Sequence, residues 1–352
     1  MTTTLTPAST DAPAKVLGGI ARTTLRLHRW ALWLWTAYVA LGTGLLLWAR
    51  GPAANELRSL LASCDTGTTV PDACLSRLDA ALGSYETLLR TGSYVILLIP
   101  FLVGAWAAAA LTAREMETGT AHLAWTQSVT PARWLTAKLA LPAVAVTAGT
   151  TLLLALYRLT HIEGSGPFEA VTHATRSPWG EDFFTGMGVV MVPRVLCGVA
   201  VGVLLGLLLR RTLASLGTGL LLMATGTASF TAGRQHLWPA EIRYGYAEDE
   251  SSPRWDTVND EWPMDSGAVT RSGELVGYDY GCLDAVHPSD GPPGDADDFY
   301  ACLRADGYTD VWVTYHPEDH FWPLQLVESG IWLAVAALAV FLSYRVLRRR
   351  TA

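Results

Sequence analysis

The sequence predicts an all-α polytopic membrane protein with six transmembrane helices and a small, disulfide-stabilised α+β extracytoplasmic insertion between helices five and six. Three observations predict this fold. Half of the 352 residues are hydrophobic and only 16% are charged, whereas soluble chains carry about 25% charged residues. Six stretches are apolar over the roughly 20 residues that a helix needs to cross a bilayer. Residues 233–323 concentrate the acidic side chains, with 19 Asp and Glu against 5 Arg.

The uneven charge excludes several classes of protein. The 233–323 segment has a net charge of −14, and the rest of the chain, with 13 acids against 20 bases, has a net charge of +7. A single soluble domain or a disordered chain would not divide in this way. A nucleic-acid partner is not expected, because the basic residues form no continuous patch.

The six predicted spans are almost free of charge. The fourth contains Arg194, the sixth contains Glu328, and the other four contain no charged residue. Backbone groups find no water inside hydrocarbon, so uncharged runs of this length should be helical. The spans are 30–49, 92–113, 139–157, 185–209, 212–232 and 324–344.

The basic residues predict the orientation, because short cytoplasmic loops are enriched in Lys and Arg. With both termini inside, the inner segments carry 13 bases and the two short outer loops carry 6. The chain is therefore expected in the cell membrane with both termini cytoplasmic. We expect a cytoplasmic tail and interfacial helix over 1–29, five spans over 30–232, an acidic extracytoplasmic domain over 233–323, and the sixth span with a basic cytoplasmic tail over 324–352.

Residues 15–29 mix apolar side chains with three arginines. This pattern suits a helix that lies on the inner leaflet and contacts membrane lipid. A solvated lead-in to the first span is the alternative.

Four of the five cysteines fall on the predicted outer side, where thiols can pair. The local pairs Cys64–Cys74 and Cys282–Cys302 are favoured, although four cysteines allow three connectivities. Unpaired thiols are the alternative. The fifth, Cys197, lies within the fourth span and there behaves as a small apolar side chain.

The sequence contains no recognisable catalytic set. A nucleotide-binding loop needs Gly-Lys-Ser/Thr, but both lysines, Lys15 and Lys138, follow an alanine. The zinc-protease motif His-Glu-x-x-His is missing as well. We therefore expect a protein that is not an enzyme and has no cofactor or metal. His316 and His320 have the spacing of helical metal ligands, but Pro317 lies between them, so a solvated turn next to the membrane is favoured over a metal site.

Arg194 and Glu328 are the two charges within predicted spans. A charge in a span costs several kcal/mol unless it faces a partner, water or the interface. Glu328 is expected about one turn below the outer boundary, where it could stay hydrated. One interpretation is that the two residues line a translocation pathway or brace the helices. The other is that they satisfy each other, or nearby carbonyls, for packing alone.

The loop 113–138 between the second and third spans is more elaborate than a short connector. Glu115 and Glu117 continue the helix beyond the membrane, and Gly119 breaks it. A short apolar element around Leu123 and Trp125 follows. Such a loop offers an amphipathic contact to a partner protein. A helix resting on the membrane surface is the alternative.

This loop carries a family resemblance. The pattern Arg-Glu-x-Glu-x-Gly-Thr, followed by Ala-Trp-Thr-Gln-Ser-Val, Arg-Trp-Leu and Lys, resembles the permease subunits of type-2 (ABC-2 type) ABC exporters of the actinobacterial branch. The similarity extends to Phe-Trp-Pro-Leu-Gln and Glu-Ser-Gly-Ile before the last span. It covers most of the membrane part and says little about residues 233–320.

The resemblance implies that the chain is the permease subunit of an ATP-driven exporter. Such a subunit has a cytoplasmic ABC ATPase and a second permease chain, identical or different, as partners. By this resemblance, the 113–138 loop holds the coupling helix, with Glu115, Glu117, Thr120, Trp125, Gln127 and Arg133 as the contact residues. The alternative is a membrane sensor or immunity protein whose acidic ectodomain binds an extracellular ligand. The resemblance does not identify the transported substrate.

Overall fold

A computed structural model of the chain describes residues 26, 29–64, 72–126, 129–164, 179–244, 261–277, 282 and 296–351. The fold divides into two compact units. The first, here called the helical unit, comprises Met1–Phe168, Thr185–Ala228 and Ser329–Ala352. The second, called the mixed unit, comprises Glu169–Phe184 and Ser229–Glu328.

Six helices in the described part of the chain are long and apolar enough to cross a membrane, as the sequence predicted. Five of them extend beyond the predicted apolar runs at one or both ends, because helical structure continues into the neighbouring polar residues. Their bounds are Arg29–Cys64, Ser76–Glu117, Pro131–His161, Met191–Leu209, Thr212–His236 and Glu318–Thr351.

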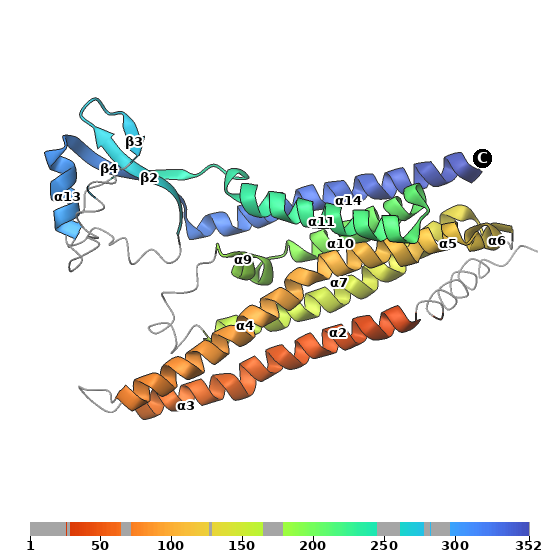
Figure 1. Ribbon diagram of the computed structural model, residues 1–352, viewed down its shortest axis with the longest axis horizontal. Coiled ribbons are helices and arrows are strands. Elements are labelled where there is room, and N and C mark those ends of the chain that lie inside the picture. Colours follow the sequence, from red (N-terminus) through yellow and green to blue (C-terminus); the bar gives the residue numbers. More distant parts are fainter. Residues whose placement is uncertain are drawn as a thin grey trace, which may run out of the picture. The chain divides into compact units, whose positions relative to one another are not determined.

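Three of these helices lie side by side in the helical unit. They are α2 (Arg29–Trp48), α4 (Asp72–Trp106) and α7 (Pro131–Gly164) (Figure 1). Helix α10 (Met191–Leu209) packs against α4 and α7 and is the most buried of the six. The remaining two long helices are α11 (Thr212–Gly233) and α14 (Phe321–Thr351).

The contact between α4 and α10 depends on two glycines. A Cβ atom placed on Gly198 would lie 3.1 Å from the carbonyl oxygen of Pro100 and 3.4 Å from the Cα of Gly104. Small residues allow helix backbones to approach this closely within a membrane. The pair therefore sets the closest approach of the two helices.

Two long helices contain π-helical segments. Segment η1 (Ala49–Ala53), which contains Pro52, joins α2 to α3 (Ala54–Cys64). Segment η2 (Ala107–Ala113) joins α4 to α5 (Arg114–Glu117). Proline lacks an N–H donor, so a wider helical turn accommodates it. A disulfide joins Cys64 to Cys74 at the end of the α3–α4 hairpin, and an apolar cluster that includes Leu57 and Tyr85 packs the hairpin.

The predicted bounds of the fourth span are wrong at the N-terminal side. Helix α10 begins at Met191 rather than at residue 185, and residues Glu181–Met187 form a separate short helix, α9. Gly186 lies at the end of α9, and Gly188 lies in the break that follows it. Glycine is a poor helix former, so this apolar run does not form one continuous helix.

The mixed unit contains a four-stranded antiparallel sheet in the order β1-β4-β2-β3. The strands are β1 (Glu241–Tyr244), β2 (Trp262–Thr270), β3 (Leu275–Gly277) and β4 (Tyr308–His316). All four fall between α11 and α14 in the sequence.

One side of the sheet is covered by a helix and a disulfide. Helix α13 (Ala296–Ala305) packs against β4, and a bond joins Cys282 to Cys302. A small core forms from Ala268, Cys282, Leu303 and Val311. The 3₁₀ turns η3 (Arg234–His236) and η5 (Glu318–His320) also belong to this unit.

Candidate functional site

The polypeptide between α4 and α7 forms a folded, two-helix loop. After η2, the short helix α5 ends at Glu117, and Gly119 adopts a positive φ of 73° that reverses the chain. Helix α6 (Thr120–Thr126) follows. A left-handed residue is favourable only for glycine here, which explains why the helix stops at this point.

The α7 helix begins with a regular cap. The Thr130 hydroxyl accepts a hydrogen bond from the backbone N–H of Arg133 at 3.4 Å, and Pro131 occupies the first helical position. Threonine before a proline is a favoured start of a helix. The Arg133 side chain is exposed. It therefore lies on the surface at the start of α7.

Glu115 is held by two side chains of α7. Its Oε2 atom accepts a hydrogen bond from Nε1 of Trp134 at 3.1 Å, and its Oε1 atom forms an ion pair with Lys138. Lys138 is only 3% exposed, so its ammonium group needs a counter-charge. The structure thus gives Glu115 a role within the chain, and a direct contact with an ATPase stays a prediction.

Glu117 also bonds within the chain. Its Oε2 atom accepts hydrogen bonds from the backbone N–H of Thr212 at 2.9 Å and from the Thr212 hydroxyl at 2.5 Å. Thr212 is the first residue of α11, where backbone N–H groups have no partner within the helix. A carboxylate at this end is stabilised by the helix dipole. Glu117 therefore caps α11 from another helix.

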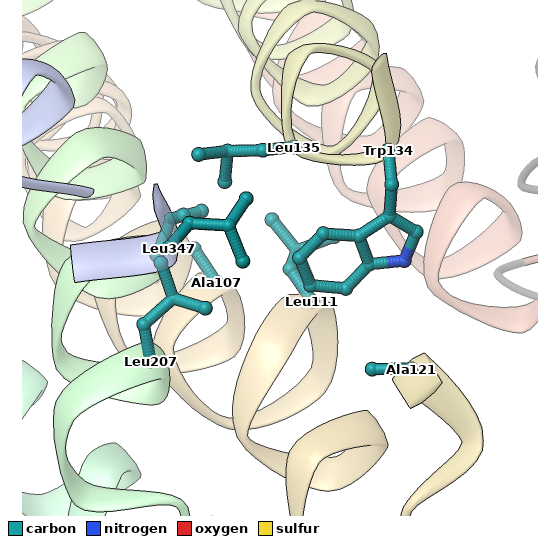
Figure 2. Packing of buried hydrophobic residues seen from close by; sticks show 8 residues of the cluster. Ala107, Leu111, Ala121, Trp134, Leu135, Leu207 and Leu347 are labelled. Carbon is teal, nitrogen blue, oxygen red and sulfur yellow. The ribbon is translucent and has the colours of Figure 1, made fainter. Parts of the chain in front are cut away.

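An apolar cluster, here called the loop cluster, joins the loop to the ends of four long helices. The side chains converge on a common centre (Figure 2). Each element contributes to it: η2 by Ala107 and Leu111, α6 by Ala121, α7 by Trp134 and Leu135, α10 by Val203 and Leu207, and α14 by Leu347.

Trp125 packs against the loop cluster. It is partly buried, and its ring packs edge-to-face against Trp134 with the centroids 5.8 Å apart. The aromatic pair attaches α6 to the start of α7. Part of the Trp125 ring is therefore covered by a residue of the same chain, nine positions later in the sequence.

The outer side of α6 is solvent-facing. Leu123 is 64% exposed, and the Thr120 side chain is exposed as well, with its hydroxyl 3.0 Å from that of Thr118. Gln127, the remaining predicted contact residue, lies outside the described residues. Of the predicted coupling residues, Thr120 and Arg133 are thus on the surface, whereas Glu115 and Trp125 face inward.

Arg194 is fully buried in the helical unit. Its guanidinium lies 5.8 Å from the centroid of the Trp332 ring, which a cation can approach favourably. Trp332 in turn occupies the space beside Gly226. This arrangement supports a bracing role for Arg194, and a role in a translocation pathway stays a prediction.

Glu328 is fully buried, so the expectation that it is hydrated was wrong. Its Oε2 atom accepts a hydrogen bond from Nε of Arg234 at 3.2 Å, and both side chains are almost inaccessible to solvent. The Arg234 guanidinium also lies 3.8 Å from the centroid of the Phe184 ring. Gln325 donates a hydrogen bond to the backbone oxygen of Phe184 at 2.6 Å. These groups satisfy one another in a buried polar cluster.

Sequence reasoning missed Arg234 because it follows the fifth apolar run and was assigned to the acidic domain. A signal was present, however. The fifth predicted span ends, and the sixth begins, on the same side of the membrane. A lone arginine after one and a lone glutamate just inside the other are therefore candidates for a pair.

Comparison with known proteins adds one finding. A family model described as ABC-2 membrane transporter related matches residues 36–233, more than half of the 352 residues. The matched range contains the α5–α6 loop and Arg194. No curated protein and no solved structure matches the chain.

Proposed function

The chain belongs to the ABC-2 membrane transporter related family, and from this premise we propose that it is the permease subunit of an ATP-driven exporter. Its six apolar helices make it a multi-pass membrane protein. The sequence lacks a Gly-Lys-Ser/Thr loop, so the proposal assigns ATP hydrolysis to a separate cytoplasmic ATPase.

The exposed side of α6 supports this assignment. Leu123 is exposed on a helix whose opposite side is anchored by Ala121 and Trp125 in the loop cluster. An apolar side chain held at the surface of a rigid element is well suited to bind a groove of a partner protein. Arg133, exposed at the start of α7, adds a charge that can pair with an acidic residue of that partner. The exposed Leu123 on an anchored helix α6 is the observation that carries the proposal.

The loop cluster provides a physical route for coupling. When the ATPase closes on ATP, a push on α6 reaches α7 through the Trp125–Trp134 contact. It reaches α10 and α14 through Leu207 and Leu347. Packed cores tend to switch between discrete arrangements rather than deform continuously. The ATPase can therefore bias two arrangements of the helices, provided that it contacts them differently.

The proposal also includes sidedness and a second chain. With the α5–α6 loop and both termini in the cytoplasm, residues 233–323 and the Cys64–Cys74 hairpin lie outside the cell. Both disulfides then form on the oxidising side, which agrees with where such bonds persist. A second permease chain, identical or different, completes the transporter in the cell membrane.

A matched pair of variants tests the coupling surface. Leu123→Gln changes the exposed face of α6, and Leu213→Gln changes a leucine that is 85% exposed in the first turn of α11. Each full-length variant is co-expressed with the ABC ATPase that the proposal assigns to it and is purified in detergent. We expect Leu123→Gln to reduce ATPase co-purification by about 10-fold or more, as for a hot-spot residue, and Leu213→Gln to leave it unchanged.

Two results would overturn the assignment. Normal ATPase binding by Leu123→Gln, together with an equally normal Arg133→Glu variant, would show that the partner binds elsewhere. Export that continues in cells lacking the ATPase would show that the chain is not energised by it. Circular dichroism and thermal unfolding of each variant separate a lost contact from a lost fold.

A further inference from the structure

An apolar cavity lies between three long helices of the helical unit. Its volume is about 430 Å³, and its walls come from the first half of α2, the end of α4 with η2, and the first half of α7. The lining includes Ala31 and Leu34 of α2, Leu102 of α4, Leu111 of η2 and Ala145 of α7. Every residue that lines the cavity has an apolar or aromatic side chain.

Two aromatic residues of the wall are held in place by α4 and α7. Nε1 of Trp35 donates a hydrogen bond to the backbone oxygen of Ala145 at 3.1 Å, and the Tyr38 hydroxyl donates one to the backbone oxygen of Val95. The Trp35 ring also fills the space beside Gly149, where a Cβ atom would lie 2.6 Å from it. The polar atoms of both aromatic residues are therefore bonded to the protein, and the cavity is preformed.

The cavity opens at the surface of the helices. Leu34 and Leu102 line it, yet they are 71% and 51% exposed. Water does not suit the interior, because a buried water needs two to four polar partners. An empty void would forfeit the van der Waals contacts of its walls. The three helices are among the six candidate membrane spans, so the material at the opening is lipid hydrocarbon.

A positive charge lies close to the cavity along α2. Arg29 begins α2 and is exposed, and Ala31 of the lining follows two residues later. Two residues of a helix rise about 3 Å. The Arg29 guanidinium lies 5.7 Å from the centroid of the exposed Trp30 ring. Tryptophan and arginine at the end of a span are typical of the headgroup level of a membrane.

Two clusters of possible metal ligands in the described residues do not form a comparable site. The Nδ1 atoms of His316 and His320 share a hydrogen bond at 3.0 Å. His316 is fully buried, so the solvated turn expected from the sequence was wrong. Cys282 and Cys302 lie beside Asp306 but are joined in a disulfide, which leaves no thiolate to bind a metal.

We propose that the cavity binds one acyl chain of an anionic phospholipid, with the headgroup phosphate at Arg29. An apolar cavity of about 150 Å³ already accepts benzene, so this larger one accepts a longer hydrocarbon. A lipid chain is apolar wherever it lies in the membrane, so its preference for the cavity comes from van der Waals packing and from the guanidinium–phosphate contact. The proposal does not depend on the ATPase or on the sidedness of the chain.

Photolabelling tests the acyl-chain site. The full chain is reconstituted without an ATPase into phosphatidylcholine vesicles that contain phosphatidylglycerol with a diazirine on one acyl chain. Peptide mass spectrometry after irradiation should show labelling of residues 102–106 and 141–146 that saturates as the probe fraction rises. The exposed surface around Leu338 of α14, which is 57% exposed, reports ordinary lipid contact and should not saturate.

A matched pair of variants tests whether the chain lies inside the cavity. Ala31→Phe places a ring in the cavity and should reduce labelling of residues 141–146 by about 10-fold. Ala40→Phe makes the same change at an exposed alanine of the same helix that is not part of the lining, and should leave this labelling unchanged. Near-ultraviolet circular dichroism checks that both variants fold.

A second probe tests the headgroup contact. Phosphatidylcholine with the same diazirine chain carries a cation of its own and should label the cavity about 5-fold less than phosphatidylglycerol does. Arg29→Gln should remove this difference. Arg348→Gln, which removes another exposed arginine near the end of α14, should preserve it.

Three results would overturn the proposal. Labelling of residues 102–106 and 141–146 that fails to saturate, as around Leu338, would show ordinary lipid contact only. Unchanged labelling in Ala31→Phe would place the acyl chain outside the cavity. Equal labelling of the wild type by the two probes would show that the site does not select an anionic headgroup.

Discussion

The Glu117 carboxylate caps helix α11 by accepting hydrogen bonds from both the backbone N–H and the hydroxyl of Thr212. The two residues are 95 positions apart. Glu117 ends α5, which continues the second long helix, whereas Thr212 begins the fifth. The contact therefore links the α5–α6 loop to a helix outside the loop cluster, and a displacement of α5 would expose the first N–H groups of α11.

Removing this cap should loosen the start of α11. In Glu117→Ala, the Thr212 N–H loses its acceptor, so the first-turn amides of α11 should exchange with deuterium several-fold faster than in the wild type. Hydrogen-exchange mass spectrometry measures this. Glu117→Gln keeps an acceptor oxygen and should show a smaller effect. Equal exchange in all three proteins would show that the carboxylate does not hold α11.

The stability of the protein should depend on which member of the Glu115–Lys138 pair is removed. Glu115→Ala removes the carboxylate that pairs with the buried Lys138 ammonium and should cost about 3–5 kcal/mol. Lys138→Met removes the buried charge, while Glu115 keeps the hydrogen bond from Trp134, so its cost should be smaller. Thermal unfolding in detergent compares the two. A larger loss of stability in Lys138→Met than in Glu115→Ala would contradict this prediction.

The buried Arg234–Glu328 pair should behave in the same asymmetric way. Glu328→Ala leaves the Arg234 guanidinium buried, at a cost of about 3–5 kcal/mol. The double variant Arg234→Met/Glu328→Met removes both charges and should recover most of that stability. Unfolding midpoints of the single and double variants test this. If the double variant is no more stable than Glu328→Ala, the ion pair itself provides net stabilisation.

The cysteines give a direct test of sidedness. Four of the five form the two disulfides, and Cys197 is buried. Intact cells treated with a membrane-impermeant maleimide should therefore show no labelling before reduction. After treatment with an impermeant reductant, Cys64, Cys74, Cys282 and Cys302 should all be labelled, as peptide mass spectrometry can establish. Labelling that requires permeabilised cells would place the disulfides on the cytoplasmic side.

The helices could be predicted from the sequence because the lipid environment imposes a simple condition. Charge-free runs such as 92–113 can only be helical there, and α4 with η2 covers that run. The break before Met191 was missed, since the run 185–209 is apolar apart from Arg194 and its hydropathy gives no sign of a break at the two glycines. Apolar and polar side chains alternate along Tyr308–Tyr315, which is typical of a strand, and β4 covers these residues.

The side-chain partners were harder to predict than the helices. The cap of Thr212 by Glu117 and the pairing of Glu328 with Arg234 join residues about 95 positions apart. No local pattern encodes such distances. The sequence identified Glu115 and Trp125 as unusual for a connector, but it could not show that Lys138 and Trp134 cover them.

The contact of Gly104 with Gly198 has a mechanical consequence. Backbone atoms, rather than side chains, meet at this point, so a side chain added at Gly198 would press the two helices apart. We expect α4 and α10 to stay in close contact at this point and to tilt about it. A movement transmitted from the loop would then tilt the two helices relative to each other about this contact. The displacement would be largest at the ends of the helices that lie farthest from the contact.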